Sequence, residues 1–228
     1  MFNNRKVIVS MTSWTKRINN VPKVVFSILS NTIKPDSIEL NLSSDEFLNK
    51  ENDLPKEVLL LNQNGFININ WVKENTGVFK KIIPTIKKYF NDDYYLISVD
   101  DDWLYNKDFI ETLLKRLGDG DWYSLQNYNE VIGNSTIYRS YVFKESFWNN
   151  ITDELVKIGI DDWYTTSYLR KFNFTQPSQI HNLLKYSAKA FNQIFPNSHN
   201  KTDGNGDYEP ERVKRVYQIT AEIMRNFK

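Results

Sequence analysis

Residues 94–102 read YYLISVDDD, so an apolar run of strand length is followed at once by Asp100, Asp101 and Asp102. Such a run predicts a β-strand that is buried on both faces, as at the centre of a parallel sheet. Adjacent carboxylates repel one another, and their position at the end of a buried strand costs stability unless they share a cation. The stretch therefore predicts both a sheet-based fold and the place of a polar site.

The acidic cluster has two interpretations. Oxygen ligands in a chain without cysteine favour a hard divalent ion, Mg²⁺ or Mn²⁺. The alternative is a solvated acidic turn before the next helix, with Asp102 or Asn106 at the helix N-terminus. The buried strand favours the ion site, because ligands of parallel sheets bind beyond the carboxyl ends of the strands.

Strand and helix patterns alternate through the first half of the chain. Apolar or alternating runs predict further strands at residues 6–11, 37–42 and 66–72. Apolar residues spaced by three and four predict amphipathic helices at residues 21–29, 82–90 and 109–117. This order predicts right-handed β-α-β units, and hence an α/β, Rossmann-like fold with a mostly parallel central sheet flanked by helices.

The second half of the chain is less regular. Its patterns predict a strand at residues 138–143, a short helix at 161–171 and a closing amphipathic helix at 213–227. Residues 196–210 are rich in Asn, Asp and Gly, which predicts a loop.

Composition limits the classes of function. The 228 residues include 29 Lys and Arg against 28 Asp and Glu, and this balance argues against a general nucleic-acid binder. A hydrophobic content of 40% excludes a disordered chain, and the absence of cysteine excludes a thiolate zinc site and a Cys nucleophile. No integral membrane segment or signal peptide is recognised, so we expect a cytoplasmic protein with at most a peripheral position at the inner face of the membrane.

Five segments resemble a known enzyme family, in the family's own order. They are VIVSMTSWTKR at 7–17, SILSNTIKPD at 27–36, KKIIP at 80–84, SVDDD at 98–102 and IDDWYTTSYL at 160–169. Together they resemble GT-A fold glycosyltransferases, in particular the family 2 type that builds bacterial capsules and surface polysaccharides.

The resemblance implies a nucleotide-sugar site around the acidic cluster. In such enzymes the loop after the first strand holds the nucleotide base and ribose. The D-x-D element contacts the ribose through its first Asp and binds Mn²⁺ or Mg²⁺ through its last. The implied nucleotide-sugar residues are Thr12, Ser13, Lys16, Arg17, Lys80, Lys81, Asp100 and Asp101, and the implied metal ligands are Asp102, Asp100 and, from a late histidine, His199. A surface histidine is the alternative interpretation of His199.

The segment at 160–164 resembles the Glu-Asp element that supplies the catalytic base in inverting members of the family. The second acid of that element takes the proton of the acceptor hydroxyl, which assigns the base to Asp162. Asp161 replaces the more usual Glu, and it is implied, with Trp163, to support the base or the acceptor. The alternative is that Asp161 and Asp162 only favour the N-terminus of a helix.

The resemblance therefore implies a metal-dependent, inverting hexosyltransferase of the EC 2.4 class, acting from a nucleotide sugar, most simply a UDP-sugar, on a hydroxyl of a surface glycan or lipid-linked glycan. We expect one domain over residues 1–228, with a nucleotide-binding half at 1–105, an acceptor-binding half at 106–195 and a loop and helix at 196–228.

Three alternatives stay open at this point. A nucleotidyltransferase on a similar sheet would also use paired acids and Mg²⁺, although the loop at residues 11–15 lacks the glycines expected of one. A non-catalytic carbohydrate- or partner-binding domain would keep the fold without the chemistry. A retaining mechanism would keep the family but change the role of Asp162.

Overall fold

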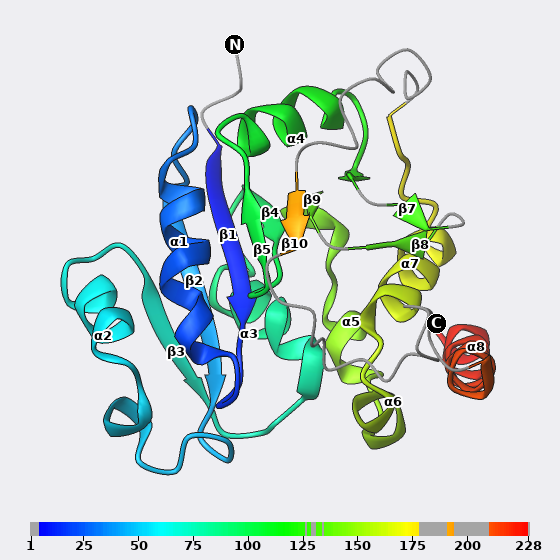
Figure 1. The fold of residues 1–228 in the computed structure, drawn as a ribbon. Coiled ribbons are helices and arrows are strands. Elements are labelled where there is room, and N and C mark those ends of the chain that lie inside the picture. Colours follow the sequence, from blue (N-terminus) through cyan, green and yellow to red (C-terminus); the bar gives the residue numbers. More distant parts are fainter. Residues whose placement is uncertain are drawn as a thin grey trace.

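The computed structural model describes residues 5–125, 127–128, 131–133, 135–177, 191–193 and 210–227. Its centre is a six-stranded sheet with the strand order β3-β2-β1-β4-β9-β6 (Figure 1). These strands are β1 (Lys6–Thr12), β2 (Ser37–Ser43), β3 (Asn68–Val72), β4 (Tyr94–Ser98), β6 (Trp122–Ser124) and β9 (Thr136–Arg139). The first four are parallel, and β9 runs antiparallel between β4 and β6. The predicted mostly parallel α/β sheet is confirmed.

Helices cover both faces of the sheet and enclose one apolar core on each side. One face packs against α1 (Val21–Leu29), α2 (Lys56–Gln63) and α4 (Phe109–Leu117). The other packs against α3 (Ile83–Lys88), α5 (Glu145–Asn149), α6 (Asp153–Ile158), α7 (Asp161–Lys171) and α8 (Pro210–Asn226). Two small antiparallel pairs lie outside the main sheet: β5 (Trp103–Tyr105) with β10 (Phe191–Gln193), and β7 (Asn127–Tyr128) with β8 (Val131–Ile132).

The alternating sequence of strand β2 places apolar side chains on one face of the sheet and polar side chains on the other. Its apolar side chains enter the core shared with α1 and α2, whereas Glu39 and Asn41 are buried on the opposite face. Glu39 accepts hydrogen bonds from Lys88 (2.8 Å), Tyr89 (2.8 Å) and Asn70 (2.7 Å). Burial alone would raise the pKa of Glu39, but these bonds to its charged form lower the pKa to about 2. The carboxylate is therefore fully compensated by its neighbours.

Most predicted elements are confirmed, with two corrections. The predicted strand at 138–143 is wrong in its bounds, because β9 ends at Arg139 and the 3₁₀ turn Ser140–Val142 follows. The apolar pattern continues past the strand since the side chains of Val142 and Phe143 stay buried where the chain turns. The predicted helix at 82–90 is present but shorter, because α3 spans Ile83–Lys88, and a separate 3₁₀ turn, η3 (Gly77–Lys81), precedes it.

Helix α2 was not predicted from the sequence. The loop predicted at residues 196–210 lies outside the described residues, apart from Pro210. The division into two halves stays a prediction. In the described part of the chain, no helix combines the length and apolar character needed to cross a bilayer.

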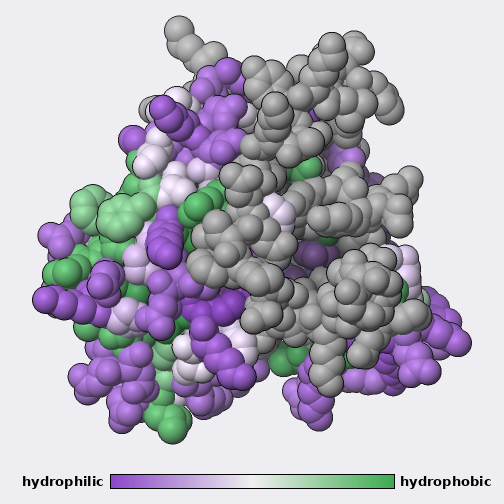
Figure 2. Space-filling view, viewed as in Figure 1, coloured by the Kyte–Doolittle hydropathy of each residue, from purple (hydrophilic) through white to green (hydrophobic). Residues whose placement is uncertain are grey.

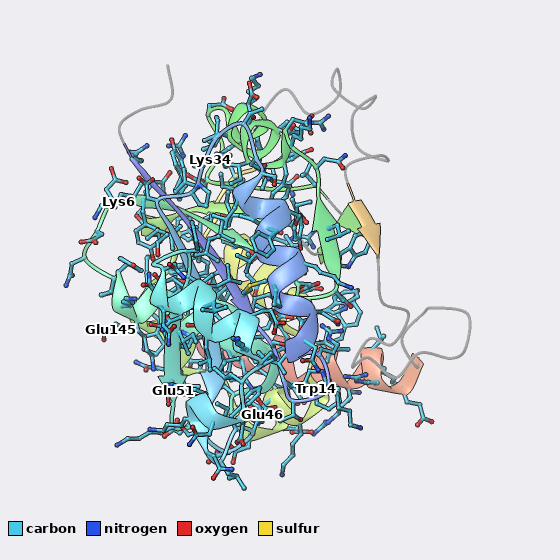
Figure 3. The ribbon with its side chains drawn as sticks, turned by 60° about the vertical axis from the view of Figure 1, so that its left-hand side comes forward. Lys6, Trp14, Lys34, Glu46, Glu51 and Glu145 are labelled. Atoms are coloured by element: carbon cyan, nitrogen blue, oxygen red, sulfur yellow. The ribbon has the colours of Figure 1, made fainter. Side chains whose placement is uncertain are left out.

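The parallel strands all end at one edge of the sheet, and this edge carries the site. Figure 3 shows Lys6, at the start of β1, at the opposite end of the molecule from Trp14 and Glu46, which follow the ends of β1 and β2. Residues that are far apart in the sequence therefore meet beyond the carboxyl ends of the strands, where ligands of such sheets bind.

Candidate active site

A cavity of about 350 Å³ opens at the carboxyl edge of the sheet. One wall comes from the segments that follow β1 to β4, and the other from η3, the α6–α7 connection and α8. On the face seen in Figure 2, hydrophilic side chains gather around the lower end, where β1 and β2 end in Figure 1. The residues implied by the resemblance that line the cavity are Thr12, Ser13, Arg17, Lys80, Lys81, Asp100, Asp101, Asp102, Asp161 and Asp162.

The carboxylates after β4 are held by the loop that follows β1. Ser13 donates a hydrogen bond from Oγ to Asp101 Oδ2 at 2.6 Å. Arg17 donates from Nη2 to Asp101 and from Nη1 to Asp102 Oδ2, the latter at 2.9 Å. Asp101 and Asp102 are both nearly inaccessible to solvent, so this guanidinium offsets much of their mutual repulsion.

Lys81 connects this cluster to the start of α7. Its Nζ lies 3.0 Å from Asp100 Oδ1 and 3.3 Å from Asp161 Oδ2. Burial alone would lower the pKa of Lys81, but the negative charges of Asp100 and Asp161 outweigh it and raise the pKa well above its usual value. The side chain is therefore a permanent cation that two acidic segments share.

Asp162 differs from its neighbour Asp161. It lines the cavity, and its carboxylate makes no hydrogen bond or ion pair with any other described residue. Burial, and then the charge of Asp161, raise the pKa of Asp162 well above its usual value. A carboxylate with a raised pKa is a stronger base near neutral pH, which suits it to accept a proton from a hydroxyl.

Two glycines allow the walls to approach each other. Gly159 ends α6 with φ +67°, a left-handed conformation that places Asp161 and Asp162 at the start of α7. Gly77 has φ +56°, and a Cβ atom there would lie 3.2 Å from the carbonyl oxygen of Val156. The turn that carries Lys81 therefore packs directly against α6.

Lys80 ties together the segments that follow β2 and β3. Its Nζ lies 2.6 Å from Glu46 Oε2 and 2.6 Å from Asn75 Oδ1, and the side chain is almost fully buried. Lys80 thus stabilises the cavity wall through these two partners.

The comparisons with known proteins agree with this architecture. No family model matches the chain, and no curated protein matches its sequence. Staphylococcus aureus TarS 1-349 in complex with UDP-GlcNAc superposes with a TM-score of 0.58 at 15% identity, over 97% of this chain and 67% of that chain. The fold is that of GT-A-type glycosyltransferases.

Two further TarS structures give the same result. TarS 1-349 has a TM-score of 0.56 at 13% identity, over 97% of this chain and 66% of that chain. A longer TarS structure has a TM-score of 0.58 at 13% identity and is covered over 40% of its length. This chain therefore spans about two thirds of the length of TarS 1-349 and 40% of the longer TarS structure.

Two of the residues implied by the resemblance do not line the cavity, and the position of a third is not described. The Nζ of Lys16 lies 5.1 Å from the ring centroid of Trp14, and it is Trp14 that lines the cavity. Trp163 packs edge-on against Tyr217 of α8, with ring centroids 3.9 Å apart, and does not line the cavity. His199 lies outside the described residues, as does His181.

Sequence reasoning missed several lining residues. Glu46 and Asn75 follow the ends of β2 and β3. Ligands of parallel sheets bind beyond the carboxyl ends of the strands. Site residues were sought in the sequence only after the first and fourth strands, and the same search after the second and third strands would have found Glu46 and Asn75. Lys157 on α6 and Arg212 on α8 also line the cavity, and no pattern in the sequence places either near the sheet edge.

Asp100 and Asp102 are suited to hold a divalent ion. Oxygen atoms of a bound substrate would complete the coordination of that ion. Burial, and then the charge of Asp100, raise the pKa of Asp102, so an added positive charge beside it would be favourable. Among the described residues, no group of three or more acidic or histidine side chains is arranged to hold a metal by itself. Mg²⁺ usually takes one or two carboxylates together with substrate phosphates, and two carboxylates suit this mode.

Proposed function

We propose that this protein is a metal-dependent, inverting glycosyltransferase that moves a sugar from a UDP-sugar to a hydroxyl of a bacterial surface glycan. The observation that carries the proposal is Asp162, a carboxylate with a raised pKa and no ion-pair partner among the described residues, in the cavity at the sheet edge of a GT-A-type fold. The choice of donor is supported by TarS, which is similar in fold and has been solved in complex with UDP and with UDP-GlcNAc.

The donor would lie over the ends of β1 to β4. Thr12, Ser13 and Asp100, which line the cavity, would contact the ribose and base, and Trp14 lines the same cavity. Arg17 lies between Asp101 and Asp102, where its guanidinium can also contact a diphosphate.

Asp100 and Asp102 would hold Mn²⁺ or Mg²⁺. When bound, such an ion supplies Lewis-acid stabilisation to the negative charge that develops on the leaving nucleoside diphosphate. The chain's own contribution there is the cationic pair of Arg17 and Lys81, which lies against the same carboxylates.

Asp162 would accept the proton of the acceptor hydroxyl as that oxygen attacks the anomeric carbon. The bond from the anomeric carbon to the diphosphate oxygen breaks on the opposite side, which inverts the configuration. The ion pair between Lys81 and Asp161 fixes the first turn of α7, and thereby the position of Asp162.

A ligand panel and a transfer assay test the proposal. Thermal unfolding is measured with UDP, GDP, CDP and ADP, each with Mn²⁺ and with EDTA. A nucleotide at about a hundred times its Kd adds about 2.7 kcal/mol, which raises the Tm of a domain of this size by about 5–10 °C. We expect a Mn²⁺-dependent shift with UDP, and the absence of a shift with every nucleotide would contradict the donor site.

The transfer assay addresses the chemistry. Asp162→Asn should abolish sugar transfer and leave the UDP shift intact, and the product should have the anomeric configuration opposite to that of the donor by NMR. A product with the donor's configuration would show that Asp162 is not the base of an inverting displacement.

A further inference from the structure

A network of polar side chains lies between the sheet and the segment formed by η3 and α3, and the scheme above gives it no part. Its members are Ser10 of β1, Glu39 and Asn41 of β2, Asn70 of β3 and Thr85 of α3. Ser10, Asn41 and Thr85 are inaccessible to solvent. A buried polar group that lacks a hydrogen bond costs stability, so the partners of these side chains decide where the segment rests on the sheet.

The innermost hydrogen bonds of this polar network converge on the main-chain carbonyl of Lys81. Ser10 Oγ donates to that oxygen at 2.5 Å, and Asn41 Nδ2 lies 3.4 Å from it. Ser10 Oγ is also 2.6 Å from Thr85 Oγ1, which in turn lies 3.0 Å from Asn41 Nδ2. Because the one hydroxyl proton of Ser10 is directed to Lys81, Thr85 donates to Ser10 and accepts from Asn41. The bonds therefore run in one direction, toward the carbonyl of Lys81.

The outer part of the network sets the orientation of the Asn41 amide. Asn70 Nδ2 donates to Asn41 Oδ1 at 3.0 Å and to Glu39 Oε2 at 2.7 Å. Asn70 Oδ1 accepts from Lys88 Nζ at 3.2 Å, and the same ammonium lies 2.8 Å from Glu39 Oε2. With its oxygen turned to Asn70, the amide of Asn41 presents its NH₂ group to the inner hydroxyls.

Lys81 joins the polar network to the candidate active site. Its carbonyl oxygen accepts the bonds described above, while its Nζ contacts Asp100 and Asp161. Lys81 is also the last residue of η3, and the carbonyl groups at the end of a helical turn have no partner within that turn. Donors from the sheet therefore fix the backbone from which the ammonium reaches its two carboxylates.

We propose that Ser10, Asn41 and Thr85 are positioning residues, which hold the carbonyl of Lys81 and thereby direct its ammonium to Asp100 and Asp161. Apolar contacts alone are not directional and tolerate sliding of the turn along the sheet, whereas a satisfied hydrogen-bond network specifies one arrangement. The effect of these residues on sugar transfer rests on the proposed function. Their effect on the placement of Lys81 is measurable in a protein without any transfer activity.

A double-mutant cycle in denaturant unfolding of the whole chain tests the proposal, with Ser10→Ala, Lys81→Met and the double variant. Lys81→Met removes the ammonium but leaves the carbonyl that Ser10 binds, so a purely local role of Ser10 would make the two effects independent. We expect the double variant to be less destabilised than the product of the two effects on the unfolding equilibrium constant, by about fivefold. The reason is that an absent ammonium has no placement left to lose.

Two substitutions of Thr85 and one control sharpen the cycle. Thr85→Val keeps the shape of the side chain without its hydroxyl and should couple to Lys81→Met, whereas Thr85→Ser keeps the hydroxyl and should not. Thr136→Val is the matched control, because the hydroxyl of Thr136 is equally buried on the same sheet but bonds Ser124 and Gly133. Its effect should be independent of Lys81→Met.

The inference is overturned if Ser10→Ala acts independently of Lys81→Met, or if Thr136→Val shows the same coupling. Thr85→Val decides the point should Ser10→Ala not fold. In the transfer assay, Ser10→Ala should lower kcat by about fivefold and should cause no further loss in the Lys81→Met background, so independent effects on kcat would also contradict the inference. Coupling in unfolding without any sugar transfer would contradict the proposed function and leave the positioning role standing.

Discussion

The two acidic clusters of the cavity consist of the same residue type in different surroundings. After β4, Asp101 and Asp102 share the guanidinium of Arg17, and Asp100 contacts Lys81. At the start of α7, Lys81 also contacts Asp161, whereas Asp162 has no such partner among the described residues. Neighbouring carboxylates with different surroundings are typical of acid–base sites, so the difference is consistent with the proposal that the first cluster binds the donor and the second carries the base.

The largest expected effect comes from removing the carboxylate of Asp162. Asp162→Asn should lower kcat by about 10²–10⁴-fold, because it removes a general base. Asp161→Asn is the matched control on the same turn and should retain more activity, since it leaves the base present and alters only its position and its pKa. Steady-state kinetics of the two variants decide the point, and equal losses would show that the two carboxylates are not functionally distinct.

Removing the shared cation should cost stability in both clusters. Lys81→Met leaves Asp100 and Asp161 without their common partner, and we expect the free energy of unfolding to fall by about 3 kcal/mol. Denaturant unfolding measures this change, with Lys87→Met as the exposed control, expected to change stability by less than about 0.5 kcal/mol. A loss no larger than that of the control would mean that the clusters do not depend on Lys81.

Glu39 extends the comparison to a carboxylate with the opposite pKa shift. Its pKa is lowered from 4.5 to about 2 in the folded chain, so its contribution is present above about pH 4.5 and is lost as the pH falls toward 2. The shift corresponds to about 3 kcal/mol. The difference in unfolding free energy between the wild type and Glu39→Gln should therefore shrink between about pH 6 and about pH 2. A difference that stays constant with pH would exclude this linkage.

The smallest expected effect concerns the metal. Asp102→Asn, or EDTA with the wild type, should weaken UDP by at least about tenfold, the equivalent of one charge-assisted contact. Asp108→Asn serves as a control outside the cavity. UDP affinity that is unaffected by both treatments would indicate that the first cluster binds the donor through Arg17 and Lys81 alone.

Local patterns predicted the sheet, and the contiguous segments 94–102 and 160–169 drew attention to acidic residues that line the cavity. The sequence therefore indicated the carboxylates but not the residues that pair with them. For example, the contact from Lys81 to Asp161 joins positions that are 80 residues apart. Arg212 illustrates the same limit, since its place depends on how α8 docks on α6 and α7. Periodicity reports which face of a helix is apolar, but not which neighbour covers it.

The close approach at Gly77 has a consequence for how the cavity tolerates change. A methyl group here would meet the carbonyl oxygen of Val156 at 3.2 Å and would need a left-handed backbone, so the turn bearing Lys80 and Lys81 or the facing end of α6 would have to shift slightly. Variation that retunes substrate choice would be absorbed more easily at the rim of the cavity, around Trp14, Glu46 or Lys157, than at Gly77.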